Sequence, residues 1–278
     1  MLSLFVNRLT VIDFALLDVQ AGLLGESWLV DITITGELDD QGMLFDFGFL
    51  KKQAKAFIES HYDHKLLVPL QDPKLQLTKI EGQVELTYQY QKKTLIHQSP
   101  ETALALIESD KITTSIIEEK LSIQLMNLMP KNVESVDIKL YTESSDDYFY
   151  QYCHGLKKHQ GDCQRIAHGH RSKIEIYCDG ERNTTTEKKW IKRWQGIYIG
   201  TVEDCVDPKA HILDFSYQSS QGFFRLQIPA VDCCLVQAES TVENIAQFIV
   251  QHLKRENPHY HYQVHAFEGV DKGAVAIL

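Results

Sequence analysis

The sequence predicts an α+β protein made of two tandem copies of one small domain, with residues 1–145 forming the first copy and residues 146–278 the second. The 278 residues exceed one average domain and suit two. Strand-like and helix-like segments follow one another in a similar order in both halves. Two sequence landmarks also recur. MLFDF precedes VDIKLYTE in the first half, and HILDF precedes YQVHAFE in the second.

In the first half, strands are expected where β-branched and aliphatic residues dominate or alternate with polar ones, over residues 2–17, 28–38 and 133–142. FLKKQAKAFIESHY at 49–62 has apolar residues at helical spacing and lysines on the opposite face, which predicts a helix. A second helix is expected over 114–129, ended by Pro130. Between these helices, GQVELTYQYQKKTLIHQ indicates a β-hairpin within an insertion at about residues 70–110.

In the second half, the same criteria predict strands over residues 148–156, 172–178 and 262–267. STVENIAQFIVQHLK at 240–254 predicts a helix with a Ser or Thr cap at its N-terminus. KKWIKRW at 188–194 is the densest basic and aromatic cluster. It is expected to form an amphipathic strand or loop in an insertion-like segment.

Composition narrows the range of functions. Hydrophobic residues make up 44% of the chain and charged residues 24%, as in ordinary globular proteins. The formal net charge of −10 argues against a general nucleic-acid partner, because phosphate backbones are bound mainly by clustered Lys and Arg. A small phosphorylated substrate needs only a few local cations and stays compatible with this charge.

The expected compartment is the cytoplasm. The first residues, MLSLFVNRLTVIDF, lack the features of a signal peptide, and no apolar run approaches the roughly 20 residues that span a bilayer. All six cysteines lie in the second half. In a reducing compartment, these residues are expected to be free thiols, metal ligands or a nucleophile.

The segment YQYCHGLKKHQGDCQRIAHGHRSKIE carries the most specific pattern in the chain. His168 and His170 are two apart in a predicted strand, so they face the same side, and His154 at the end of a neighbouring strand can join them. Three imidazoles leave one open position on a tetrahedral Zn²⁺ ion, as in catalytic zinc sites. Two alternatives remain open, namely a chance H-x-H pair and a structural zinc with Cys163 as fourth ligand.

YQYCH, DCQRIAHGHRS, STVEN and HAFE resemble segments of the 6-pyruvoyl- and 6-carboxy-tetrahydropterin synthases. In the first half, ELDDQGMLFDFGFLKK and DHKLL are similar to the turn-helix and Asp-His motifs of that family. The resemblance covers most of both halves apart from the 70–110 insertion.

The resemblance implies that each copy is a tunnelling fold (T-fold), an antiparallel four-stranded sheet with helices on one face, and that copies associate into barrels. A homo-oligomer, such as a dimer or trimer of chains, is expected. It also implies a zinc-dependent lyase that acts on 7,8-dihydroneopterin triphosphate and eliminates triphosphate. Neither a membrane nor a nucleic acid is an expected partner.

The family's functional residues transfer to this chain residue by residue. The zinc ligands match three histidines, the general base matches a cysteine, and the pterin anchor matches a carboxylate. The matching residues are His154, His168 and His170, then Cys163, then Glu268. Thr241 matches a threonine near the pterin, although a simple helix N-cap explains it equally well.

The first half departs from the family pattern. Leu24-Gly25-Glu26 stands where the family has H-G-H, and the earlier ligand position falls in the histidine-free segment 11–15. Asp63 and His64 are nevertheless kept, whereas the equivalent of this pair in the second half, placed at 231–234, has no histidine. We therefore expect one complete site, with Asp63 and His64 of the first half joining Cys163 of the second.

Three points stay open in the sequence. Asp63 and His64 are also explained as a pair at a helix C-terminus. Glu143, taken as the equivalent of Glu268, is either the anchor of a second pterin or a surface carboxylate. The alternatives to a lyase are a pterin- or purine-binding protein without turnover and a zinc-free enzyme with aldolase- or epimerase-like chemistry.

Overall fold

The computed structural model describes residues 1–144 and 148–278. The first half contains one five-stranded sheet and two helices, namely β1 (Leu2–Asp18), β2 (Gly22–Gly36), α1 (Phe47–His61), β3 (Leu66–Pro69), β7 (Leu104–Ile107), α2 (Thr114–Met126) and β8 (Val133–Tyr141). The strand order is β7-β3-β1-β2-β8. β1, β2 and β8 pair antiparallel, whereas β3 and β7 extend the sheet in parallel.

The second half repeats this arrangement with β9 (Phe149–His154), β10 (His168–Cys178), β11 (Glu181–Arg182), α3 (Thr184–Trp194), β12 (Ile197–Thr201), β15 (Cys233–Val236), α4 (Val242–Glu256), β16 (Tyr262–Phe267) and β17 (Gly273–Ile277). Its strand order is β15-β12-β9-β10-β16-β17, and β11 pairs with β10. β9, β10, β16 and β17 form four antiparallel strands, and β12 and β15 are parallel additions.

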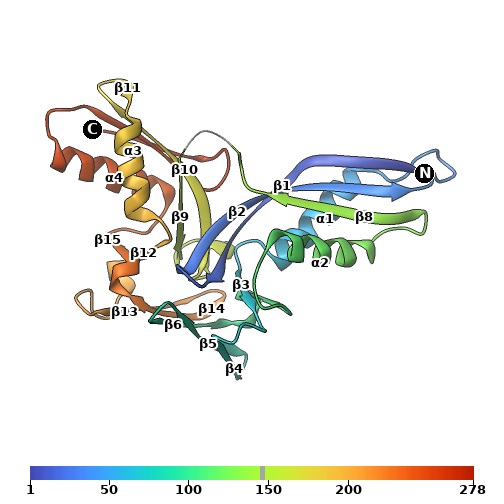
Figure 1. Ribbon diagram of the computed structural model, residues 1–278, viewed down its shortest axis with the longest axis horizontal. Helices are drawn as coiled ribbons and strands as arrows, with labels where there is room; N and C mark the ends of the chain where they lie inside the picture. Colours follow the sequence, from blue (N-terminus) through green and yellow to red (C-terminus); the bar gives the residue numbers. More distant parts are fainter. Residues whose placement is uncertain (145–147) are drawn as a thin grey trace.

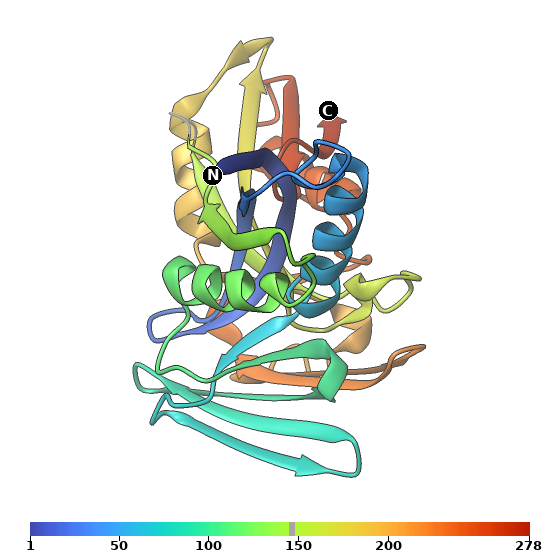
Figure 2. The ribbon, with the colours of Figure 1, turned by 90° about the vertical axis from the view of Figure 1, so that its right-hand side faces the viewer.

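A third sheet joins the two halves. It consists of β4 (Leu75–Ile80), β5 (Gln83–Tyr90) and β6 (Lys93–Pro100) from the first half and β13 (Ile212–Ser219) and β14 (Gly222–Pro229) from the second. The strand order β13-β14-β6-β5-β4 shows that β14 pairs directly with β6. Figures 1 and 2 both show this sheet at one end of the molecule, beneath the other two sheets.

The two halves are related by a pseudo-two-fold axis, because equivalent strands pair at equivalent positions. Pro100 and Pro229 end the matching strands β6 and β14, and each precedes a one-turn 3-10 helix, η1 (Glu101–Ala103) or η4 (Ala230–Asp232). Three residues before these prolines lie His97 and Leu226, which pair with each other across the β6–β14 contact. Such self-pairing of equivalent positions is the mark of an isologous interface.

The same axis passes where β1 and β2 cross β9 and β10 (Figure 1). Gly25 pairs with Ala15 in the first half, and Gly169 pairs with Cys153 in the second. Ala15 in turn pairs with Leu66, and Cys153 with Tyr198. The pairing therefore aligns the two halves without reference to residue identity.

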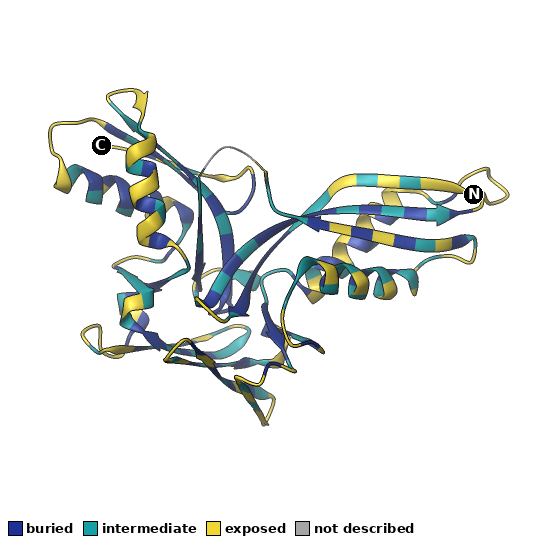
Figure 3. Cartoon of the chain, viewed as in Figure 1, coloured by how far each residue is buried: buried dark blue, intermediate teal, exposed yellow. Residues whose placement is uncertain are grey.

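The helices cover one face of each sheet, and their starts follow from side-chain caps. Asp46 accepts a hydrogen bond from the Phe49 N–H at the start of α1, and Thr241 does the same for Asn244 in α4. One apolar core lies between α1, α2 and their sheet, and another lies between α3, α4 and theirs. Burial is deepest at the crossing of the sheets, whereas the N-terminal end of β1 is largely exposed (Figure 3).

The structure confirms the two tandem T-fold copies and corrects four details. In the sheet formed by the first half alone, only three described strands, β1, β2 and β8, pair antiparallel. Residues 188–194 lie in α3 rather than in a strand or loop. MLFDF leads into α1, whereas HILDF lies largely in β13, so these two landmarks are not equivalent. The hairpin predicted within the 70–110 insertion also has a counterpart in β13 and β14, and only β4 lacks one. The predicted seam at 145/146 lies outside the described residues.

Among the described residues, no helix has the length and apolar character needed to cross a bilayer.

Candidate metal centre

Three histidines converge where β9 and β10 cross the first half. His154 ends β9 and pairs directly with His168, the first residue of β10, while His170 follows two residues later on the same face. The ring centroids lie 4.4 Å apart for His154 and His168 and 5.3 Å apart for His154 and His170. One ligand atom from each of the three lies within 4.8 Å of the others, and all three side chains are buried.

Hydrogen bonds fix the tautomers of two of these rings. His154 Nδ1 lies 2.8 Å from the Ser240 carbonyl oxygen, and His168 Nδ1 lies 2.9 Å from the Arg165 carbonyl oxygen. Each Nδ1–H must donate to these acceptors, so each Nε2 keeps its lone pair. Both Nε2 atoms are buried without a hydrogen-bond partner.

His170 completes the cluster with a different outer contact. Its Nδ1 lies 3.3 Å from Asp13 Oδ1, and its Nε2 lies 3.9 Å from Glu268 Oε1. Burial, followed by the neighbouring imidazoles, holds the pKa of His154 and His168 well below the usual range, so both rings are neutral at physiological pH. Neutral nitrogens that are buried and lack partners fit a divalent ion such as Zn²⁺.

A second group of side chains adjoins this cluster and comes from both halves. Cys163, in the 3-10 helix η2 (Asp162–Gln164), lies beside His64. One ligand atom each from His64, Cys163 and His168 lies within 4.8 Å of the others. The His64 and His168 ring centroids are 5.2 Å apart. The structure therefore brings Asp63 and His64 together with Cys163, as the sequence predicts.

His64 is held by its neighbours in a charged form. Its Nδ1 lies 2.7 Å from Asp63 Oδ2. Burial lowers the pKa of His64, but the hydrogen bond with Asp63 and the adjoining Cys163 outweigh burial and raise this pKa to about 10. Arg165 Nη1 donates to the backbone carbonyls of Asp63 and His64 at 3.2 and 3.3 Å, and so anchors the turn that carries the pair.

The two predicted substrate-binding residues lie in different surroundings. Glu268 follows β16, with its carboxylate near His170 and partly exposed. The Thr241 side chain caps α4, where its Oγ1 accepts the Asn244 N–H at 3.4 Å, and the preceding Ser240 contacts His154. The pterin-binding role of both residues stays a prediction.

Strand register confirms that Leu24-Gly25-Glu26 is the counterpart of His168-Gly169-His170, and it corrects three other equivalences drawn from the sequence. The counterparts of His154, His168 and His170 are Leu16, Leu24 and Glu26, so the first ligand position lies one residue beyond the segment 11–15. The turn after α3 matches the turn after α1. In this alignment, Gly196, with φ of 65°, is the counterpart of His64, with φ of 54°. The Asp-His equivalent is therefore Gln195-Gly196 rather than part of 231–234.

Glu143 is not the equivalent of Glu268. Leu140 pairs with Val30, and Ala266 pairs with Ile174, which are matching positions of β2 and β10. Two residues further along, the counterpart of Glu268 is Thr142. The Glu143 carboxylate instead lies 2.9 Å from Lys173 Nζ, in a half-buried ion pair.

Sequence reasoning missed three residues that contact the metal centre. Asp13 reaches His170 from the first half, Ser240 accepts from His154, and the Arg165 carbonyl accepts from His168. The available signal was weak, since Asp13 is an isolated carboxylate within a run of buried apolar residues.

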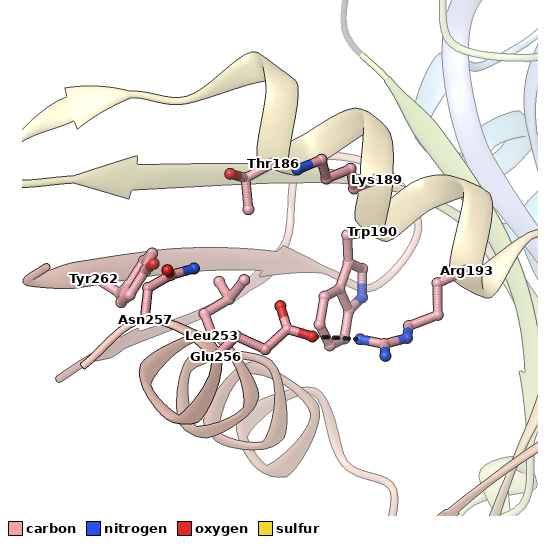
Figure 4. A pocket seen from close by; sticks show the side chains of 8 residues that line it. All are labelled: Thr186, Lys189, Trp190, Arg193, Leu253, Glu256, Asn257 and Tyr262. Carbon is pink, nitrogen blue, oxygen red and sulfur yellow. Dashed lines mark ion pairs between the residues drawn. The ribbon is translucent and has the colours of Figure 1, made fainter. Parts of the chain in front are cut away.

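A separate surface pocket lies between α3 and α4 (Figure 4), lined by Thr186, Lys189, Trp190, Arg193, Leu253, Glu256, Asn257 and Tyr262. An ion pair of 3.7 Å between Arg193 and Glu256 crosses it. None of its residues belongs to the histidine cluster or to the group around Cys163.

Comparisons with known proteins identify the family of this chain. The family model described as 6-pyruvoyl tetrahydropterin synthase matches residues 21–138 and 143–276, well over half of the chain. A 6-carboxy-5,6,7,8-tetrahydropterin synthase from Rickettsia typhi is 34% identical over 62 residues, which cover 21% of this chain and 45% of that protein. A Pyrococcus abyssi protein provisionally assigned the same name is 24% identical over 119 residues, covering 43% of this chain and 68% of that protein.

Among solved structures, 6-pyruvoyl tetrahydropterin synthase from Plasmodium vivax is similar, with 18% identity and a TM-score of 0.42, over 52% of this chain and 93% of that one. The tandem match of the family model, covering both halves, shows that this chain belongs to the 6-pyruvoyl tetrahydropterin synthase family.

Proposed function

We propose that this protein is a zinc-dependent lyase that acts on 7,8-dihydroneopterin triphosphate and releases triphosphate. The observation that carries the proposal is the meeting of Cys163 from the second half with Asp63 and His64 from the first, beside three histidines that suit a metal. A family member without turnover would have no need to keep a thiol, an Asp-His pair and a metal cluster together.

His154, His168 and His170 would hold the zinc, with Cys163 outside the ligand set. Zinc, when bound, would polarise the hydroxyl oxygens of the substrate side chain. The fit rests on the buried Nε2 atoms of all three rings, which have no hydrogen-bond partner. Such buried polar atoms are costly unless a ligand satisfies them.

Cys163 would act as the general base, and His64 would support it. The Cys163 thiolate takes a proton from a side-chain carbon of the substrate next to the carbon that bears the triphosphate. The electron pair left behind forms a carbon–carbon double bond, and the carbon–oxygen bond to triphosphate breaks. An imidazolium at His64, held by Asp63, stabilises the thiolate before the step because the two charges are opposite.

Glu268 would anchor the pterin ring. Its partly exposed carboxylate lies 3.9 Å from His170 Nε2, so a ring bound there would reach towards the metal centre. A carboxylate can accept two parallel hydrogen bonds from the N–H edge of a pterin. Thr241 begins a helix beside the same cluster and would contact the substrate or only cap the helix.

We also propose a cytoplasmic homo-oligomer. All six cysteines are free thiols, which suits a reducing compartment. The strand β17 forms one edge of its sheet and exposes Val275 and Ile277. An exposed apolar edge favours pairing with another copy of the chain.

The test is to incubate zinc-loaded protein with 7,8-dihydroneopterin triphosphate and to follow the products by mass spectrometry, with zinc measured on the same sample. We expect released triphosphate and a pterin with an altered side chain. The variant Cys163→Ala, with its zinc content matched, should leave the substrate intact. Unchanged substrate after incubation with the zinc-loaded wild-type protein would refute the proposal.

A further inference from the structure

We propose that Asp13, on β1 of the metal-free first half, is a positioning residue for the metal centre of the second half. It would fix the ring of His170 and, at the same time, hold the turn that carries Asp63 and His64. This inference rests on the metal-binding part of the proposed function. It assigns a role to a residue for which the sequence pattern suggests none.

The Asp13 side chain is buried and is itself tightly held. Its Oδ1 lies 3.3 Å from His170 Nδ1 and accepts a hydrogen bond from Ser27 Oγ at 2.5 Å. Its Oδ2 lies 3.0 Å from Lys272 Nζ. A buried carboxylate that is held from two sides can orient a third group with little freedom of its own.

The backbone of Asp13 contacts the turn that carries Asp63 and His64. The Asp13 N–H donates to Asp63 Oδ1 at 2.8 Å, and the His64 N–H donates to the Asp13 carbonyl at 2.7 Å. One residue therefore forms hydrogen bonds with the turn that presents His64 and contacts the ring that completes the metal cluster. Asp13, in the first half, therefore links the position of the Asp63–His64 turn to that of the His170 ring.

The pseudo-two-fold axis provides an internal comparison. The counterparts of Asp13 and His170 are Gln151 and Glu26, and these two side chains also contact each other, through Gln151 Nε2 and Glu26 Oε1. The side chains at these equivalent positions therefore contact each other on both sides of the pseudo-two-fold axis. A carboxylate faces an imidazole only at the crossing that has the three histidines, which is where a metal would need it.

The chemistry of the contact explains its value. A carboxylate beside Nδ1 keeps the proton on that nitrogen and leaves the Nε2 lone pair free for a metal. It also makes Nε2 a stronger donor. Loss of such an outer partner costs about 10- to 100-fold in metal affinity.

The experiment compares Asp13→Asn with wild type by titrating the metal-free proteins with Co²⁺ and by zinc competition with a chelator. The asparagine keeps the size and the backbone contacts but removes the charge. We expect zinc affinity to fall by about 10- to 100-fold and the visible Co²⁺ absorption to change in position or intensity. Gln151→Ala, at the equivalent position, serves as the control and should leave both readouts unchanged.

A second arm separates positioning from general damage. In a His170→Ala background, Asp13→Asn should cause no further loss of Co²⁺ affinity, because Asp13 would act only through His170. Ser27→Ala removes the hydroxyl that donates to Asp13 Oδ1 and accepts the Arg171 N–H. It should give a smaller loss in the same direction and covers the case in which Asp13→Asn does not fold.

Equal metal affinity and spectra in wild type and Asp13→Asn would overturn the inference, as would an additive loss in the His170→Ala background. The proposed function fails in a different way, through a wild-type protein that binds no metal.

Discussion

Gly25 and Gly169 occupy equivalent positions in the two halves and lie against each other where β2 crosses β10. A β-carbon on Gly169 would lie 2.6 Å from the Gly25 Cα, and one on Gly25 would lie 2.6 Å from the His170 backbone nitrogen. Real side chains do not tolerate such distances. The absence of side chains at both positions allows the sheets to approach closely enough for residues of the first half to reach the histidine cluster.

Gly25→Ala should therefore destabilise the protein and disturb the metal centre together. We expect a loss of about 1–3 kcal/mol or more in the free energy of unfolding, because backbone rather than a flexible side chain blocks the new methyl group. Denaturant titration of the metal-free protein measures this free energy of unfolding. Gly48→Ala, within α1, is the control and should cost much less, because its new methyl group meets only a side-chain oxygen of Asp46, at 3.2 Å. Equal stability of Gly25→Ala and Gly48→Ala would contradict the close crossing.

His64→Ala should abolish most of the turnover while the protein keeps its zinc. We expect a fall in kcat of about 10²- to 10⁴-fold, the usual contribution of a group that assists proton transfer. Gln195→Ala, in the equivalent turn of the second half, is the control and should keep activity. Full activity of His64→Ala with bound zinc would remove His64 from the site.

Metal analysis should find one zinc per chain rather than two. The counterparts of the three histidines in the first half are Leu16, Leu24 and Glu26, and two leucines cannot bind a metal. Elemental analysis combined with native mass spectrometry checks this number. A chelator should remove the ion and the activity together, and zinc should restore both. A reproducible value of two per chain would require a second site elsewhere.

Glu268→Gln should weaken substrate binding, since a neutral amide accepts fewer hydrogen bonds from the ring edge and offers no charge. An increase in KM or in the Kd of a pterin analogue of about 10-fold or more is expected for a lost charge-assisted pair. Glu143→Gln provides the comparison, because Glu143 pairs with Lys173 and should affect stability rather than KM. Equal effects of the two substitutions on KM would argue against the anchor role.

His97→Leu should make stability less sensitive to acid. Burial lowers the pKa of His97 to about 3, from 6.5 in the unfolded chain, so the folded state excludes the proton. Above pH 6.5, His97 is neutral in both states and does not lower the free energy of unfolding. As the pH falls from 6.5 towards 3, His97 gains a proton in the unfolded chain only, and the free energy of unfolding falls. At pH 5 this loss amounts to about 2 kcal/mol, which His97→Leu should recover.

Denaturant titrations of wild type and His97→Leu at pH 7 and pH 5 test this expectation. His259→Leu, at an exposed position, should keep the pH dependence of wild type. An unchanged pH dependence in His97→Leu would mean that His97 is solvated in the folded protein.

The tandem fold and the meeting of Cys163 with His64 could be predicted because their signals are local. Two histidines spaced by one residue in a strand must share a face, and the Asp-His pair that is missing from the second half is present in the first. The long strands and three of the four helices follow from hydrophobic periodicity.

Other features could not be predicted, because they depend on pairing between distant segments. HILDF resembles MLFDF in letters, yet Phe215 lies in a strand of the joining sheet. The basic surface of KKWIKRW conceals a helix whose Trp190 and Trp194 are buried against α4. Such side chains satisfy both strand and helix patterns until their partner is known.

The equivalences of single residues also needed the register of the sheets. Glu143 and Glu268 both lie shortly after the end of a strand. Only the strand pairing shows that their positions differ by one residue. Asp13 has no sequence signal for its contact with His170, because that contact joins residues 157 positions apart across the crossing of the sheets. A shift of one residue in a strand reverses the side to which a side chain points.

The most direct test of a site shared between both halves is a crystal structure of the zinc-loaded protein with anomalous diffraction at the zinc edge. We predict one peak per chain at about 2.0–2.1 Å from a nitrogen of His154, His168 and His170, with Cys163 and His64 beside it. A peak among residues of the first half, no peak at the histidines, or a Cys163 thiol turned away from His64 would contradict it.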